Sequence, residues 1–204
     1  YLLERIEVLR GPTAMLYGLG STAGVLNMIS KRPQPEEMRE IGVQLGSFGR
    51  KQVQADLTGP LSKDGDFQFR LVAVGRDSGT QVDFIADDRV AVAPSLTWRP
   101  SAATSLTFLA SFQDDHSGWT WQFFPFSGTL LPNPNGRIPT NRFIGLPGID
   151  HYDSRRTEGG WLFEHRLNER WTFRQNFRLA ANEVDYFTAY AVSSTNPAAS
   201  YLGP

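Results

Sequence analysis

Residues that could hold a metal or carry out catalysis are scattered along this chain. Its three histidines, His116, His151 and His165, lack a metal-ligand spacing, and there is no cysteine. The glycines of segment 18–24 are spaced one residue too widely for a dinucleotide loop, and no phosphate-binding lysine follows them. No nucleophile and base form a recognisable pair. We therefore expect no enzyme, no cofactor and no metal site.

Aromatic side chains are concentrated in segment 119–126, where five occur within eight residues. They are Trp119, Trp121, Phe123, Phe124 and Phe126. Such a group is costly to leave in water, so it should either pack together or cover a ligand. No lysine or arginine occurs between residues 114 and 130, which suits a bulky ligand without strong negative charge.

Composition limits the classes of protein to consider. The chain has 204 residues, a formal net charge of −1 and 20% charged residues, so nucleic acid is not an expected partner. No apolar run reaches the roughly 18 residues that a transmembrane helix needs. The chain begins inside a strand pattern, without an initiator methionine or a signal peptide. We therefore expect a piece of a longer protein.

From position 39 onward, apolar and polar residues alternate with the period of β-strands. One face is apolar, and the other carries Gln, Asp and Arg. The apolar positions include Val53, Ala55 and Leu57; Phe67, Phe69, Leu71 and Ala73; Val90, Val92, Pro94, Leu96 and Trp98; Leu106, Phe108, Ala110 and Phe112; and Trp171, Phe173, Phe177 and Leu179. This pattern predicts about seven strands of roughly 9–11 residues, long enough to cross a bilayer when tilted.

The connections between these strands differ in length. The tight turns lie at 59–66, 99–104 and 168–170, and the long loops at 77–89 and 114–157. A soluble β-sandwich also alternates, but short turns at one end and long loops at the other are typical of an outer-membrane barrel. Trp98 and Trp171 adjoin short turns, where an interfacial aromatic belt would place them. The sequence favours the barrel over the sandwich.

The first residues form a different kind of unit. Ile6 and Val8 alternate with charged residues as in a strand, and residues 25–29 are apolar enough for a second strand. Between them, Pro12 suits the first position of a short helix over 13–17, which Gly18 would end. From pattern alone, this could equally be a strand–helix–strand piece of an ordinary α+β domain.

This opening segment resembles the plug of TonB-dependent outer-membrane receptors, in its C-terminal half. The resemblance rests on Glu4-Arg-Ile-Glu-Val-Leu-Arg-Gly-Pro12, Leu16-Tyr17-Gly18 and Val25-Leu-Asn-Met-Ile-Ser-Lys-Arg-Pro33. It continues through segments 89–100, 106–113 and 171–178, which are similar to the siderophore branch of the family and to its ferric hydroxamate receptors in particular. Coverage extends over nearly the whole chain.

The resemblance implies a fold and a mode of action. Residues 1–35 would be the C-terminal part of a plug domain, and 36–204 the first part of an antiparallel transmembrane barrel of roughly 22 strands. The parent protein would be a monomer in the Gram-negative outer membrane, surrounded by lipid and lipopolysaccharide. It would bind a ferric siderophore outside and import it with energy delivered by TonB, ExbB and ExbD through an upstream TonB box. A hydroxamate complex suits an aromatic cradle with few charges.

The resemblance also assigns ligand-binding residues. Tyr17 matches an aromatic at the plug apex that contacts the siderophore, although it could equally pack the short helix. Trp121 and Phe123 match two ligand-facing aromatics that precede a Pro…Gly-Thr pattern, here 125–129. The family has tryptophan at the second of these positions. We add Trp119 because it lies in the same aromatic segment.

Glu7, Arg10 and Arg32 are candidates for ion pairs that hold the plug against the barrel wall. Charges buried in a lumen must be paired. A solvated strand edge explains the same three residues equally well.

Three other functions remain to be compared with siderophore import. A TonB-coupled barrel for another cargo, such as a vitamin or a sugar, would share the plug motif. A passive porin would have no plug, and residues 4–33 argue against it. A soluble β-rich binding module is the third alternative.

Overall fold

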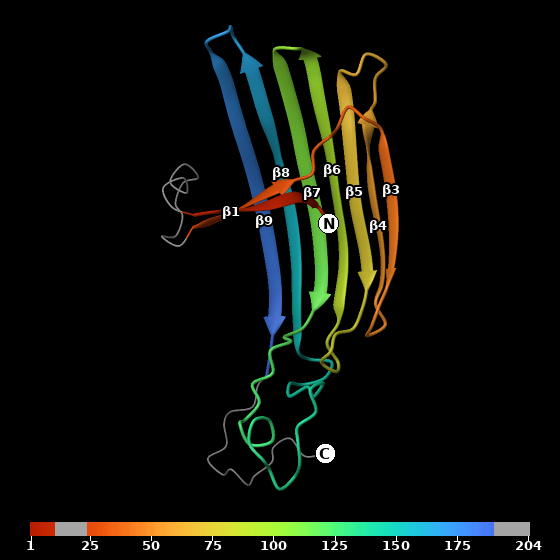
Figure 1. Ribbon diagram of the computed structural model, residues 1–204, viewed down its shortest axis with the longest axis vertical. Helices are drawn as coiled ribbons and strands as arrows, with labels where there is room; N and C mark the ends of the chain where they lie inside the picture. The colour runs from red at the N-terminus through yellow and green to blue at the C-terminus, as the bar shows by residue number, and fades with distance from the viewer. Residues whose placement is uncertain (11–23, 190–204) are drawn as a thin grey trace.

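The computed structural model describes residues 1–10 and 24–189, which form two antiparallel sheets (Figure 1). A hairpin pairs β1 (Leu3–Leu9) with β2 (Val25–Ser30). The second sheet has seven strands in sequence order: β3 (Met38–Leu45), β4 (Lys51–Pro60), β5 (Phe67–Asp77), β6 (Asp87–Ser101), β7 (Thr104–Ser117), β8 (His151–Arg166) and β9 (Thr172–Phe187). The expected all-β wall is therefore confirmed, while the short helix predicted over 13–17 lies outside the described residues.

The wall has its apolar face outward. Large exposed side chains project from one face of the strands, among them Ile41, Val43, Val53, Val90, Phe108, Phe177 and Leu179. The opposite face buries polar residues, and Asp56 and Thr58 are each only 1% exposed. Side chains alternate strictly between the faces of a strand, so this inverted distribution is what lipid outside and a polar lumen inside require.

The hairpin crosses the polar face of the wall, with a short connection leading from β2 to β3 (Figure 1). Lys31, at the start of this connection, contacts Asp56 of β4, and Ser30 of β2 contacts Arg178 of β9. These contacts identify the face of each strand that is turned towards the hairpin. We call it the inner face.

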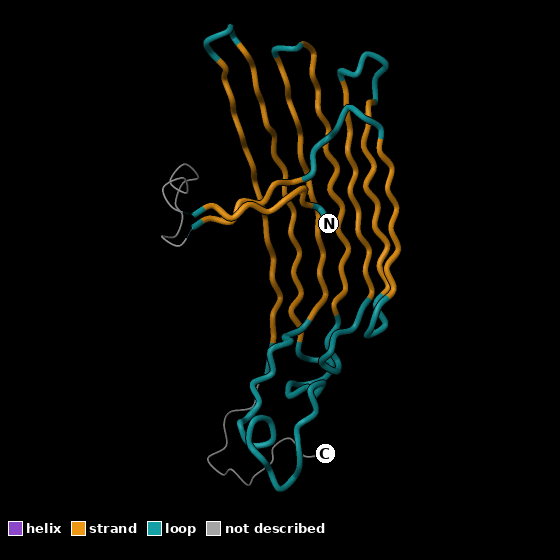
Figure 2. Tube along the Cα trace, viewed as in Figure 1, coloured by secondary structure: helices purple, strands orange, loops and turns teal. Residues whose placement is uncertain are grey.

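With one exception, the turns are sorted by length, as Figure 2 shows. Three short turns, at 61–66, 102–103 and 167–171, lie at one end of the sheet, and the loops 78–86 and 118–150 lie at the other. The tight connection 46–50 also lies at the long-loop end. At the short-turn end, the rings of Phe67 and Trp98 stack with centroids 6.1 Å apart, as an interfacial aromatic belt requires.

Strands β6 to β9 are longer than predicted, with 14 to 16 residues. The ladder continues through polar residues such as Asp114 and His116, which pair with Arg155 and Asp153 of β8. The sequence alternation marks only the apolar part of each strand, so it misses these polar extensions. Within the described residues, no helix has the length and apolar character needed to cross a membrane.

The described sheet is open, because β3 and β9 each pair with a single strand. Unpaired strand edges cannot be left facing lipid. We therefore expect residues 1–204, expressed alone and refolded in detergent, to give no closed barrel. Gel electrophoresis with and without heating tests this: a heat-modifiable, protease-resistant band from this piece would contradict it.

Candidate functional site

Four aromatic rings form a chain at the long-loop end of the wall. Trp121 meets Trp119 edge-on, with ring centroids 5.3 Å apart. Trp119 lies 5.8 Å from the ring of Tyr186, and Tyr186 lies 5.5 Å from that of Tyr152. Tilted and edge-to-face contacts at these distances are favourable for aromatic pairs. The structure thus joins two of the predicted ligand-binding residues to two tyrosines that the sequence did not single out.

The two tyrosines belong to the inner face of the wall. Tyr152 and Tyr186 pair across β8 and β9 in a ladder without register shifts. Residues at even positions of β9 share the face of Arg178, whose guanidinium reaches Ser30 of the hairpin at 3.2 Å. The tyrosines therefore lie at the mouth of the inner face, not on the lipid side. The sequence did not single them out, because the contact of Tyr186 with Trp119 joins segments that are distant in the sequence.

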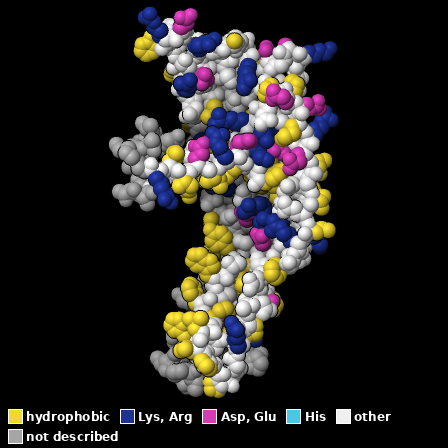
Figure 3. Space-filling model, viewed as in Figure 1, with side chains coloured by type: hydrophobic (Ala, Val, Ile, Leu, Met, Phe, Trp, Pro, Cys, Tyr) yellow, Lys and Arg dark blue, Asp and Glu magenta, His cyan; other side chains and the backbone are white. Residues whose placement is uncertain are grey.

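The aromatic segment is open to a ligand. Trp121 is 69% exposed and Phe123 59%, and Phe126 beyond them is 71% exposed. A group of aromatic rings exposed to this extent usually marks a site that binds a ligand or a partner. Figure 3 shows hydrophobic side chains gathered over this loop, whereas charged side chains gather around the hairpin. The loop could enclose a bulky ligand by stacking and shape, with little help from charge.

A buried ion-pair network ties the hairpin to the wall. Arg70 of β5 donates from Nε and Nη2 to the two carboxylate oxygens of Asp56, both at 2.8 Å. Lys31 Nζ lies 2.7 Å from the same carboxylate, and Glu4 of β1 lies 3.4 Å from Arg70 Nη1. The side chains of Asp56 and Arg70 are 2% and 4% exposed. The two cations and two carboxylates balance, as buried charges must.

Backbone contacts reinforce the network. Arg70 Nη1 also donates to the carbonyl oxygen of Arg32 at 3.0 Å. The backbone N–H of Gln34 donates to Thr58 Oγ1 at 2.9 Å, and this hydroxyl donates on to the carbonyl of Phe69. The connection after β2 is therefore fixed to β4 and β5 along its first residues.

The structure shows contacts for two of the three charged residues that were predicted to tie plug to wall. Glu7 accepts hydrogen bonds from Arg5 in its own strand and from Asn27 in β2, which hold the pKa of its carboxyl below the usual range. Arg32 contributes its carbonyl oxygen to the network, and Arg10 follows β1 directly. Their role as plug–wall ion pairs stays a prediction. Glu4 and Lys31 form ion pairs between the hairpin segment and the wall.

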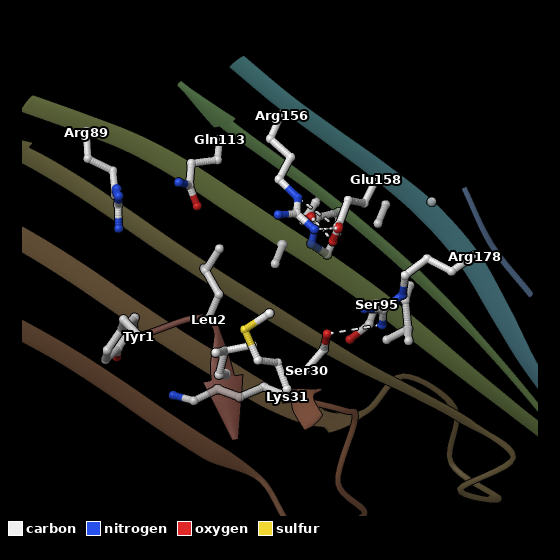
Figure 4. A pocket seen from close by; sticks show the side chains of 18 residues that line it. Tyr1, Leu2, Ser30, Lys31, Arg89, Ser95, Gln113, Arg156, Glu158 and Arg178 are labelled. Carbon is white, nitrogen blue, oxygen red and sulfur yellow. Dashed lines mark hydrogen bonds and ion pairs between the residues drawn. The ribbon is translucent and has the colours of Figure 1, made fainter. Parts of the chain in front are cut away.

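A cavity of about 270 Å³ lies between the hairpin and the inner face. In Figure 4, Arg89, Gln113, Arg156 and Arg178 project from the wall towards the hairpin. Each arginine has a partner: Arg89 pairs with Asp115, Arg156 with Glu158, and Arg178 with Ser30. The wall thus lines the cavity with partnered polar groups, whereas Leu2 and Met28 of the hairpin segment line it with apolar side chains.

Two further predictions concern the contents of the site. Tyr17 lies outside the described residues, so its ligand contact stays a prediction. Among residues 1–10 and 24–189, no three His, Asp or Glu side chains come close enough together to hold a metal ion.

Comparison with known proteins identifies relatives along nearly the whole chain. The ferrichrome outer membrane transporter/phage receptor of Escherichia coli K12 is 36% identical over 203 residues, which are 98% of this chain and 27% of that protein. The ferrioxamine B receptor of Salmonella typhimurium SL1344 is 32% identical over 199 residues, again 98% of this chain and 28% of that protein. The chain thus spans about a quarter of the length of these curated relatives. No family model matches it.

A solved structure supports the fold. The closed form of the ferric-catecholate import receptor Fiu from Escherichia coli K12 superposes with a TM-score of 0.83 over 95% of this chain and 28% of that chain. Sequence identity is 23%, so this likeness concerns the fold alone.

Proposed function

Because this chain belongs, along nearly its whole length, to the TonB-dependent siderophore receptors of the outer membrane, we propose that its parent protein imports a ferric siderophore. The observation that carries the proposal is a hairpin fixed by buried charges to the polar face of a wall whose apolar face points outward. Residues 1–35 would be the end of the plug, and residues 36–204 the first part of the barrel.

We propose a hydroxamate siderophore as the cargo. Two relatives are named for ferrichrome and ferrioxamine B, and both match 98% of this chain. The aromatic segment has no lysine or arginine between residues 114 and 130, so it suits a compact complex of low charge. The siderophore occupies all the coordination sites of its iron, so the protein need supply no metal ligand.

The partners proposed for the parent protein follow from the mechanism of the family. TonB, with ExbB and ExbD, would deliver energy to the plug, and a monomeric barrel would lie in lipid and lipopolysaccharide. The siderophore is cargo and not a cofactor, and no covalent step is needed. The strongest alternative is a TonB-coupled receptor for another cargo, because the hairpin would be part of the plug whatever the cargo. A passive porin is a weaker alternative, because a hairpin fixed across the lumen would obstruct diffusion.

The transport proposal is tested in cells that depend on the parent receptor for iron. We expect ferrichrome to support growth in iron-depleted medium and uptake to stop when TonB is deleted, because transport through a plugged barrel needs energy. Growth that survives the loss of TonB would point instead to passive diffusion.

Trp121 offers a direct test of the ligand site. In the full-length receptor, we expect Trp121→Ala to weaken ferrichrome binding by at least about tenfold, because truncating an exposed aromatic anchor removes its contact area. Equilibrium binding to the purified receptor measures the effect. Phe48→Ala, at a ring 57% exposed on connection 46–50, is the control and should bind as wild type. Unchanged affinity of Trp121→Ala for both ferrichrome and ferrioxamine B would remove this residue from the site.

A further inference from the structure

A glutamine stands between the aromatic rings of the candidate site. The side chain of Gln122 donates from Nε2 to the carbonyl oxygen of Trp119 at 2.8 Å. Its Oε1 accepts a hydrogen bond from the backbone N–H of Ile144, also at 2.8 Å. One side chain thus joins the aromatic segment to the far side of the same loop. Both its polar ends are engaged with backbone groups, which fixes the orientation of the amide.

The loop between β5 and β6 supports the same segment from outside. Ile85 is only 5% exposed, and its Cγ2 would lie 3.3 Å from a Cβ placed on Gly118, directly before Trp119. Beside it, the N–H of Asp83 donates to the carbonyl of Asn141 at 2.9 Å, and Asn141 Nδ2 donates to Asp83 Oδ2 at 2.8 Å. Loop 78–86 therefore meets loop 118–150 on both sides of the aromatic segment.

The backbone at this junction is held in an unusual conformation. Phe84 has a φ of 66°, which side-chain-bearing residues seldom adopt, and its ring lies 6.0 Å from that of Phe143. Such conformations persist where surrounding contacts enforce them, and they concentrate at functional sites. The contacts between loops 78–86 and 118–150 thus hold the two loops in a fixed arrangement.

We propose that Gln122 is a positioning residue, which together with Ile85 holds Trp119 and Trp121 in the arrangement that receives the ligand. Without these ties, segment 119–126 would sample other conformations, and the edge-on contact of Trp119 with Trp121 would no longer be fixed. A site whose rings are already arranged loses less conformational freedom on binding, so its affinity is higher. This inference rests on the proposed function of the aromatic segment as the ligand site.

Two substitutions at Gln122 in the full-length receptor test the two hydrogen bonds. Gln122→Met keeps the length of the side chain and loses both bonds, so we expect about tenfold weaker ferrichrome binding. Gln122→Glu keeps the acceptor for Ile144 N–H but places a carboxylate oxygen against the carbonyl oxygen of Trp119, so its affinity should fall at least as far as that of Gln122→Met. In uptake assays KM should rise with little change in maximal rate. Gln81→Met, at an exposed glutamine of loop 78–86, is the matched control and should match wild type.

Gly118→Val tests the second support by a separate route. The added side chain would collide with Ile85, so we expect a loss of affinity similar to that of Gln122→Met. Iodide quenching of tryptophan fluorescence, measured without ligand, reports the ring arrangement and should change in Gln122→Met but not in Gln81→Met.

The outcomes distinguish this inference from the proposed function. Unchanged iodide quenching in Gln122→Met overturns the positioning role, whichever ligand the receptor takes. Wild-type ferrichrome affinity in Gln122→Met, alongside a loss in Trp121→Ala, overturns it while leaving the ligand site intact. Altered quenching together with failure of wild type to bind ferrichrome or ferrioxamine B would support positioning and contradict the hydroxamate cargo.

Discussion

Asp56→Leu in the full-length receptor is expected to lower the free energy of unfolding by about 3–5 kcal/mol, the cost of breaking a buried ion pair by removing one partner. The substitution leaves Arg70, 4% exposed, and Lys31, 16% exposed, without the carboxylate that both contact. Urea unfolding in detergent micelles measures the change. Protease cleavage within the connection 31–37 should become faster, because the tie from Lys31 to β4 is lost.

Matched variants show whether burial is the cause. Asp56→Leu/Arg70→Met replaces both buried charges with apolar groups, and it should recover most of the lost stability. Glu37→Leu breaks a pair with Arg39 whose side chains are 60% and 76% exposed, so we expect a change within experimental error. Wild-type stability of Asp56→Leu would mean that the network does not hold the hairpin.

The second large effect concerns the lipid face. Ala110 and Ser111 are neighbours near the middle of β7, and they project from opposite faces of the strand. Ala110→Arg would place a charge towards the acyl chains, which costs about 2–4 kcal/mol near the bilayer midplane. Ser111→Arg would place the same side chain in the polar cavity, beside Glu158, whose carboxylate Ser111 contacts at 3.3 Å.

We therefore expect Ala110→Arg to fold poorly into lipid vesicles, while Ser111→Arg folds close to wild type. Urea titration after refolding into vesicles measures both, and the heat-modifiable band on gels gives an independent readout. Equal loss in the two variants would show that residues at this level of β7 do not separate lipid from lumen.

The fold was predictable because its signal is local. Apolar residues such as Phe67, Phe69 and Leu71 repeat every second position, which needs no knowledge of neighbouring strands. Turn chemistry is equally local, so the short turns were predicted close to their observed places. The polar ends of β6 to β9 lack this two-residue repeat of apolar side chains, because there both faces of the strand contact water.

The candidate site was predictable only in part. Trp119 and Trp121 lie in one aromatic segment, so composition alone drew attention to them. Tyr152 and Tyr186 join them through the ring contact of Tyr186 with Trp119, and no local pattern encodes a contact between segments so distant in the sequence. The Asp56–Arg70–Lys31 network was missed for the same reason, since its members come from three segments.

The inverted wall has a consequence for how this sequence tolerates change. In soluble proteins, exposed positions accept almost any polar residue, and buried positions gain from becoming more apolar. On β4 both rules reverse. Val53 is 56% exposed, yet a lysine there would meet lipid. Asp56 is 1% exposed, yet an aliphatic residue there would deprive Arg70 and Lys31 of the carboxylate that both contact. Substitution scores derived from soluble proteins will therefore have the wrong sign on both faces of this strand.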